Sequence, residues 1–272
     1  MFKIIKESFK ITNSNIIIAT PLIFFSLVSS LYLIFSQGGS QIGLLFSGLL
    51  FFLMLGAFLS GWFMMIMKAV KEPEIEDNKL ISEFPSGVGE YFLNILLMVV
   101  IISLVTAGII ALAILAGKKY IGGFGVSAAQ FGQALADVES MKKFVSSLSQ
   151  EQLIKINAWN CLLFFAMVFN YFIFMFYPAA IFFKKKNPFI AFWLSLKDTF
   201  GRKFFKNIAL FIMIFILYMF FSTLTVLFGN NIIVHFILTL INFYYITYIA
   251  VLIFNYYYSN FAKIGSNIDT TV

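Results

Sequence analysis

The amino-acid sequence predicts an all-α protein, a polytopic membrane bundle of six transmembrane helices with two amphipathic helices at its cytoplasmic interface. Hydrophobic residues make up 61% of the 272 residues and charged residues only 11%, whereas soluble proteins have roughly 45–50% apolar and about 25% charged residues. The apolar residues form long runs, and most basic residues stand between them. We therefore interpret residues 1–272 as a single integral membrane domain.

Each apolar run is long enough for a helix to cross the bilayer, because a hydrocarbon core of about 30 Å needs about 20 helical residues. Strands of a membrane β-barrel would instead show alternating segments of about ten residues. We expect the first run to be retained, since the apolar part of a cleaved signal peptide has only about 7–15 residues. The predicted spans are residues 16–36, 42–67, 91–116, 156–183, 208–228 and 232–258.

The basic residues predict the orientation of the spans, because Lys and Arg are retained on the cytoplasmic side. With the N-terminus inside, fourteen of the 19 Lys and Arg residues fall in cytoplasmic segments. The other five lie in the extracytoplasmic connection 117–155 and are Lys118, Lys119, Lys142, Lys143 and Lys155. We therefore expect both termini in the cytoplasm. The net charge of +7 is then a topology signal and does not indicate nucleic-acid binding.

Two connections, residues 37–41 and 229–231, are so short that their flanking spans must form antiparallel hairpins. A basic amphipathic stretch precedes each hairpin, and the second begins at Asn187 and Pro188, a pair typical of a helix start. Its aromatic residues suit the headgroup boundary, and its cations suit anionic lipid. The residues predicted to bind anionic headgroups at the cytoplasmic surface are Lys184, Lys185, Lys186, Trp193, Lys197, Arg202, Lys203 and Lys206.

The two amphipathic stretches share a short pattern. Lys6-Glu7-Ser8-Phe9 is followed by Asn15-Ile16, and Lys197-Asp198-Thr199-Phe200 is followed by Asn207-Ile208. Internal duplication, which is common in transporters, and chance similarity in a sequence of low diversity both explain this match.

Two longer connections join the remaining spans. The acidic segment 70–90 predicts a solvated cytoplasmic loop, because its carboxylates do not follow the spacing of a calcium-binding loop. In the connection 117–155, an amphipathic helix is expected after the glycines, and Ser149 with Gln152 predicts a capping box at the start of the fourth span.

The six predicted spans contain no Asp, Glu, Lys or Arg, although such residues usually mark ion or proton pathways in membranes. The polar candidates for an intramembrane site are Asn170, Asn242 and His235. Asn170 and Asn242 lie at depths that differ by about 6 Å at 1.5 Å per residue, so they could face each other. Hydrogen bonding between packed helices is the preferred explanation of both amides, and a substrate site is the alternative. Cys161 has no cysteine partner. We predict no catalytic residue, metal site or cofactor.

Several motifs resemble a known family. These are Phe176-Tyr177-Pro178-Ala179-Ala180-Ile181, the following Lys184-Lys185-Lys186-Asn187-Pro188-Phe189-Ile190-Ala191 with Ser195, and the earlier Gly61-Trp62, Lys68 and Phe84-Pro85-Ser86-Gly87. They resemble the integral membrane domain attached to glycerophosphoryl diester phosphodiesterases and its stand-alone bacterial relatives, over most of the chain. The resemblance implies a six-helix protein of the bacterial plasma (inner) membrane. Phosphodiesterase chemistry in that family belongs to a separate soluble barrel domain, which has no counterpart here.

These observations favour a non-enzymatic multi-pass membrane protein that acts in membrane organisation, lipid homeostasis or the assembly of a partner. Its expected partners are membrane lipids, and a membrane protein or a second copy of the chain would also fit. A permease for an apolar or zwitterionic small molecule is the alternative, and a lipid-modifying enzyme is a weaker one. A polar cavity reaching the middle of the membrane would favour transport, and converging acid and base groups would favour an enzyme.

Overall fold

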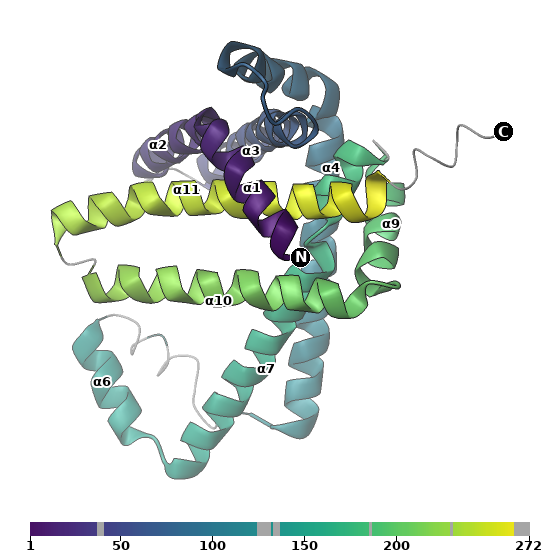
Figure 1. Cartoon of the computed structure of the whole chain (residues 1–272). Helices are drawn as coiled ribbons and strands as arrows, with labels where there is room; N and C mark the ends of the chain where they lie inside the picture. Colours follow the sequence, from purple (N-terminus) through teal and green to yellow (C-terminus); the bar gives the residue numbers. More distant parts are fainter. Residues whose placement is uncertain (37–40, 124–131, 133–136, 185–186, 229–230, 264–272) are drawn as a thin grey trace. The chain divides into compact units, whose positions relative to one another are not determined.

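The computed structural model describes residues 1–36, 41–123, 132, 137–184, 187–228 and 231–263, which are mostly helical with no strand among them (Figure 1). Six stretches of these residues are helical, long and apolar enough to cross a membrane, which confirms the predicted all-α membrane class. The helices are α1 (Phe2–Ser14), α2 (Ala19–Ser36), α3 (Gln41–Lys71), α4 (Asp77–Tyr120), α6 (Val138–Ser147), α7 (Gln150–Phe174), α8 (Tyr177–Phe183), α9 (Pro188–Phe200), α10 (Phe204–Phe228) and α11 (Ile232–Tyr257), with the 3₁₀-helix η1 (Ile16–Ile18) and the π-helix η2 (Tyr258–Ala262).

The predicted helix starts at α7 and α9 are confirmed. Asn187 caps α9, because its Oδ1 accepts hydrogen bonds from the N–H groups of Phe189 at 3.0 Å and Ile190 at 3.2 Å. At α7 the N–H of Ser149 donates to Gln152 Oε1 at 2.9 Å, and the N–H of Gln152 donates to Ser149 Oγ at 3.2 Å. Both arrangements supply partners to N–H groups that have no acceptor within the first turn of a helix.

The segment 70–90 differs from the predicted loop, because α4 begins at Asp77 and continues for 44 residues. Asp77 lies in the first turn, where a carboxylate is favoured by the helix dipole. Packing on α3 also supports this early start. A Cβ atom at Gly87 would lie 2.5 Å from Cβ of Met64, so the missing side chain lets the two helices approach closely.

The predicted span 156–183 is broken into α7 and α8. Pro178 lies in the first turn of α8 and has no N–H to donate to the carbonyl of Phe174, where α7 ends. The break places α8 in the core, where Tyr177, Ala180 and Ile181 are buried.

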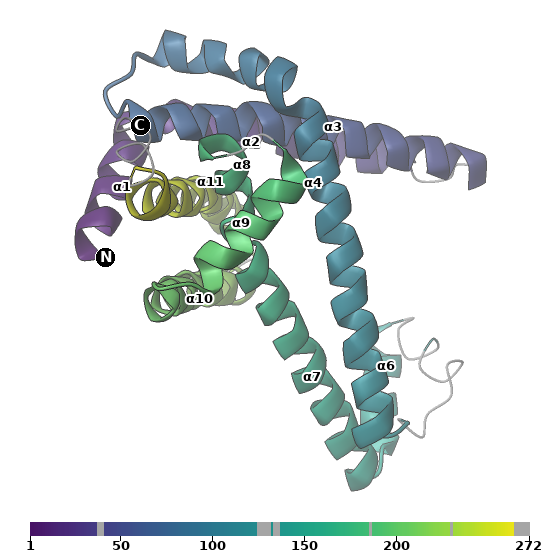
Figure 2. The same ribbon diagram turned by 90° about the vertical axis from the view of Figure 1, so that its right-hand side faces the viewer.

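The described chain forms two compact units, Met1–Ile101 with Phe172–Val272, and Ile102–Tyr171. In the first unit, α10 and α11 run side by side (Figures 1 and 2), as the short connection predicts. Helix α1 packs on α11, where Asn255 Nδ2 donates to Ser8 Oγ at 3.0 Å. The start of the chain and the end of α11 therefore lie together.

An aromatic core joins α3, α8 and α11 in the first unit. The ring of Phe63 lies 5.4 Å from that of Phe254, and Tyr91 of α4 stacks on Phe182 at 4.2 Å. Phe176 stacks on Tyr256 at 5.7 Å. Part of the high Phe and Tyr content thus fills a protein core, while other aromatic residues remain exposed.

The second unit contains α6 and the facing parts of α4 and α7. Near one end of the contact, the Thr106 hydroxyl donates to Asn170 Oδ1 at 3.1 Å. Near the other, Trp159 Nε1 donates to the carbonyl of Gly122 at 3.0 Å, and its ring covers Gly117. These contacts fix α4 and α7 as an antiparallel pair.

Candidate functional site

The exposed side of α9 and the start of α10 carries aromatic and basic side chains. Trp193 is 71% exposed and Phe189 64% exposed, and Lys197, Arg202 and Lys206 are exposed as well. We call these five residues the α9 surface. Large apolar side chains next to cations are typical of protein surfaces that enter the headgroup layer of a membrane.

The opposite side of α9 packs on the protein through small residues. Ala191, Ser195 and Thr199 are fully buried. At the start of the helix, the hydroxyl of Tyr177 in α8 donates to the carbonyl of Pro188 at 3.0 Å. Helix α9 is therefore fixed on one side by protein and presents the other side outward, an arrangement that the helical spacing alone did not specify.

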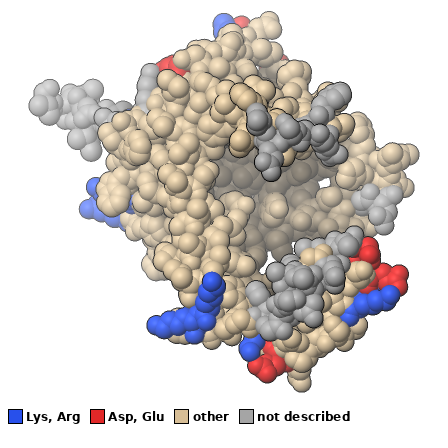
Figure 3. Space-filling model, turned by 180° about the vertical axis from the view of Figure 1, so that it is seen from behind, with Lys and Arg blue, Asp and Glu red and all other residues tan. Residues whose placement is uncertain are grey.

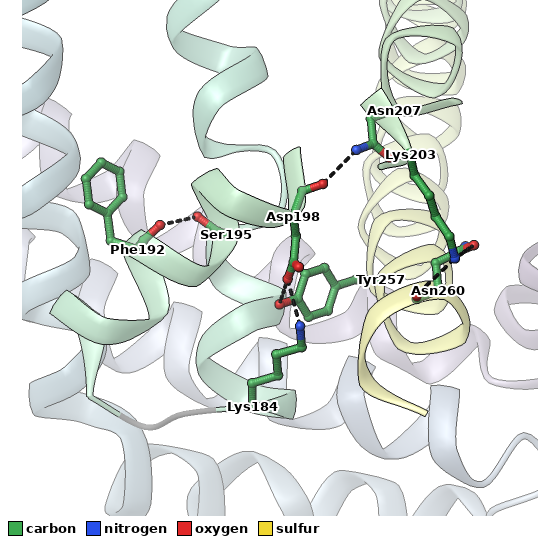
Figure 4. Close-up of polar contacts among 8 residues, drawn as sticks. All are labelled: Lys184, Phe192, Ser195, Asp198, Lys203, Asn207, Tyr257 and Asn260. Carbon is green, nitrogen blue, oxygen red and sulfur yellow. Dashed lines mark hydrogen bonds and ion pairs between the residues drawn. The ribbon is translucent and has the colours of Figure 1, made fainter. Parts of the chain in front are cut away.

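Asp198 turns toward the protein and binds two side chains, as Figure 4 shows. Its Oδ2 atom lies 2.8 Å from Nζ of Lys184 and accepts a hydrogen bond from the Tyr257 hydroxyl at 2.7 Å. The side chains of Lys184 and Asp198 are only 24% and 16% exposed. This Asp198 cluster joins the residue after α8 to α9 and to the end of α11, and it neutralises the charge of Lys184.

Lys203 also turns inward, toward the π-helix η2. Its Nζ atom donates to the carbonyl of Asn260 at 3.0 Å and to Asn260 Oδ1 at 2.9 Å (Figure 4), and it lies 5.4 Å from the centre of the Phe261 ring. Burial, and to a smaller extent the charge of Lys206, lowers the pKa of the Lys203 ammonium. Lys203 thus fixes the end of α11 against the start of α10.

Asn207 closes the turn between α9 and α10. Its Nδ2 donates to the carbonyls of Asp198 and Thr199, each at 2.9 Å, and its Oδ1 accepts from the Tyr256 hydroxyl at 3.0 Å. All three hydrogen bonds satisfy a side chain that is fully buried, so the amide determines how α10 leaves α9.

The residues predicted to bind anionic lipid therefore fall into three groups. Trp193, Lys197, Arg202 and Lys206 are exposed on the α9 surface. Lys184 and Lys203 bind protein groups instead, because a carboxylate and an amide lie within hydrogen-bonding distance of their Nζ atoms. Lys185 and Lys186 lie outside the described residues.

Tyr257, Asn207 and Asn260 were not among the predicted site residues. A signal did exist for Asp198, which is the one acidic residue within a strongly basic stretch. Two distant partners could not be identified in this way. Tyr257 lies 59 residues after Asp198, and Asn260 lies 57 residues after Lys203.

The polar candidates of the spans lie in different surroundings. Asn170 is buried in the second unit and binds Thr106. Asn242 and His235 are exposed on α11 in the first unit. The contact of Asn170 fits the packing interpretation of this amide, whereas the exposed pair would face lipid or another chain.

Charged side chains occupy a few separate patches on the face shown in Figure 3, and most of that face belongs to other residues. Within the part of the chain that the structure describes, no group of three or more His, Cys, Asp or Glu residues could hold a metal ion. The charged groups with the clearest structural role are the ion pairs Lys184–Asp198 and Lys68–Glu83, each of which joins two segments of the first unit.

Compared with known protein families, with curated proteins and with solved structures, the chain has no match. The resemblance to the membrane domain attached to glycerophosphoryl diester phosphodiesterases stays a prediction.

Proposed function

We propose that this chain is a non-enzymatic multi-pass membrane protein that binds anionic lipid through the α9 surface and acts in membrane organisation, lipid homeostasis or partner assembly. The proposal rests on the exposure of Trp193 and Phe189 beside Lys197, Arg202 and Lys206. The aromatic side chains enter the headgroup boundary, and the three cations meet the phosphate groups.

The protein contacts of α9 support this proposal, because they hold the binding residues in place before lipid arrives. Asn187 fixes the start of the helix, Asn207 fixes its end, and the Asp198 cluster fixes its inner side. Little conformational freedom is then lost on binding, which favours affinity. We place the α9 surface, helix α1 and the end of α11 in the cytoplasm of a bacterial cell.

The test compares lipid retained by the purified full-length chain with that retained by the triple variant Lys197→Gln, Arg202→Gln, Lys206→Gln. Each cation near an anionic surface contributes about 1 kcal/mol, so the variant should bind phosphatidylglycerol roughly 100-fold more weakly. Mass spectrometry of the protein with its bound lipid measures how much phosphatidylglycerol each variant retains. Repeating the measurement at rising salt concentration shows how far salt screens the attraction between the cations and the lipid.

The matched control is Lys118→Gln, Lys142→Gln, Lys143→Gln, which removes the same charge from the connection 117–155. This control should retain phosphatidylglycerol as the unchanged chain does, and both variants should retain equal amounts of phosphatidylcholine. Equal loss of phosphatidylglycerol in the two variants would mean that net charge, and not the α9 surface, attracts the lipid.

A further inference from the structure

An apolar groove of about 480 Å³ lies between α2, α3 and the first turns of α4, all within the first unit. We call it the α2–α3–α4 groove. The walls include Phe24 of α2, Met54 and Phe58 of α3, and Phe84 of α4. Among the lining residues, only Thr20 has a polar side chain. The volume falls in the range of small-molecule sites in proteins, about 300–1,000 Å³.

The groove extends from the membrane surface into the hydrocarbon region. Its walls on α2 and α3 belong to apolar runs that cross the membrane. Its walls on α4, such as Ile81 and Pro85, precede the apolar run that begins at Tyr91. A molecule that fills the groove must therefore be apolar along most of its length and must end at headgroup level.

Polar groups lie next to the surface end of the groove, beyond its apolar lining. Pro85 has no N–H, so the carbonyl of Ile81 lacks its usual helical donor, and both residues line the groove. Lys68 follows the lining residue Met65 by three positions on α3, and Glu83 adjoins the lining residue Phe84.

The side chains of Lys68 and Glu83 form an ion pair of 3.0 Å and remain 29% and 19% exposed. A cation beside a carboxylate complements a zwitterionic headgroup, whose phosphate and ammonium carry the opposite charges. The ion pair beside the groove therefore complements a phospholipid headgroup, and the groove walls complement hydrocarbon.

We propose that the α2–α3–α4 groove binds one acyl chain of a zwitterionic membrane phospholipid, with the headgroup beside Lys68 and Glu83. The site is separate from the α9 surface and requires neither anionic lipid nor the cations of that surface. It gives the chain a second and chemically different contact with lipid.

The test places the full-length chain in vesicles of phosphatidylcholine in which a fraction of the lipid carries a photoactivatable diazirine on one acyl chain. After illumination, mass spectrometry maps the labelled residues. Labelling of Phe24, Met54 and Phe58 should exceed that of Leu227, an apolar residue of α10 that is 65% exposed, by several-fold. Equal labelling would show that the groove holds only the exchanging lipid that surrounds any membrane protein, and would overturn the proposal.

Filling the groove provides the matched variants. Ala57→Trp fills the groove from α3 and should abolish the excess labelling. Gly48→Trp adds the same side chain to α3 at a position where no atom lies within 4 Å of a new Cβ, and it should preserve the excess labelling. Val28→Trp fills the groove from α2 and should also abolish the excess labelling. It replaces the Ala57 variant in the test if that variant does not fold. Excess labelling that survives in a folded groove-filling variant would contradict the proposal.

The two lipid sites can be tested independently. Because the vesicles contain no anionic lipid, the triple variant Lys197→Gln, Arg202→Gln, Lys206→Gln should show the same groove labelling as the unchanged chain. If the α9 surface does not bind phosphatidylglycerol, the groove labelling is unaffected. If the groove is not labelled in excess, the binding of phosphatidylglycerol by the α9 surface is likewise unaffected.

Discussion

Asp198 has more influence on the first unit than any pattern in the sequence indicates. It accepts from Lys184 and Tyr257, and its backbone carbonyl accepts from Asn207. One residue of α9 thereby contacts the end of α8, the start of α10 and the end of α11. A part-buried carboxylate needs such partners, because burial of an unpaired charge is costly.

Replacing Asp198 by Ala should lower the free energy of unfolding by about 2 kcal/mol, less than the 3–5 kcal/mol typical of a fully buried pair, because this pair keeps some contact with solvent. The variant leaves the Lys184 ammonium and the Tyr257 hydroxyl without their shared acceptor. Chemical unfolding of the purified chain in detergent micelles measures the change.

The double variant Lys184→Met, Asp198→Leu is the control for this prediction. It removes both charges and replaces them with apolar side chains of similar size, so much of the stability should return. If the double variant is as unstable as Asp198→Ala, packing and not charge pairing accounts for the effect.

At the scale of elements, the two hairpins of the first unit begin in similar ways. Ser8 and Thr199 are fully buried in α1 and α9, and Asn15 and Asn207 are fully buried where each amphipathic helix meets its span. The environments of the two amides differ. Asn207 Oδ1 accepts from Tyr256, whereas Asn15 Oδ1 is buried with no hydrogen-bond partner in the described chain. The match in sequence therefore extends to burial but not to every contact.

The contact between α4 and α7 depends on a glycine. A Cβ atom at Gly117 would lie 2.4–2.8 Å from the ring of Trp159, so Gly117→Ala should displace that ring and cost about 1–3 kcal/mol. Gly108 lies on the same helix with no atom within 4 Å of a new Cβ, and Gly108→Ala should be neutral or stabilise by up to about 1 kcal/mol.

Thermal unfolding in detergent measures both glycine variants, and the fluorescence of Trp159 in a chain without Trp62 and Trp193 reports the displaced ring. Gly117→Ala should lower the unfolding temperature, whereas Gly108→Ala should leave it unchanged or raise it. A Gly117→Ala variant as stable as Gly108→Ala would show that α7 can move away from α4 without loss.

At the scale of the whole molecule, the buried side chains of the first unit gather toward one end of its hairpins. On α3 they run from Phe58 to Val70, and on α11 from Tyr245 to Tyr257. The other halves of these helices are largely exposed, as at Leu45 and Ile232. Apolar surface needs no protein cover where lipid tails surround it, so most of the buried contacts can gather at one end of the hairpins.

The orientation predicted from Lys and Arg can be tested with single cysteines in a chain whose Cys161 is replaced. Cysteines at Asn231 and Ser146 should react with a membrane-impermeant thiol reagent added to intact cells, whereas those at Asn78 and Lys263 should react only after permeabilisation. Mass-tag labelling of the thiols gives the reacted fraction at each position. The reverse pattern would place both termini outside the cell.

The sequence by itself determined the membrane class, the number of long apolar helices, the short hairpins and the starts of α7 and α9. Each of these follows from neighbouring residues, because apolar runs and helix caps act over a few positions. Only the tertiary structure decided that Lys184 and Lys203 turn inward, that α8 enters the core and that a groove opens beside α3. These features join segments that are far apart in the chain, as the contacts of Asp198 and Lys203 show. The periodicity of one helix reveals which of its residues share a face, but not which distant side chains that face will contact.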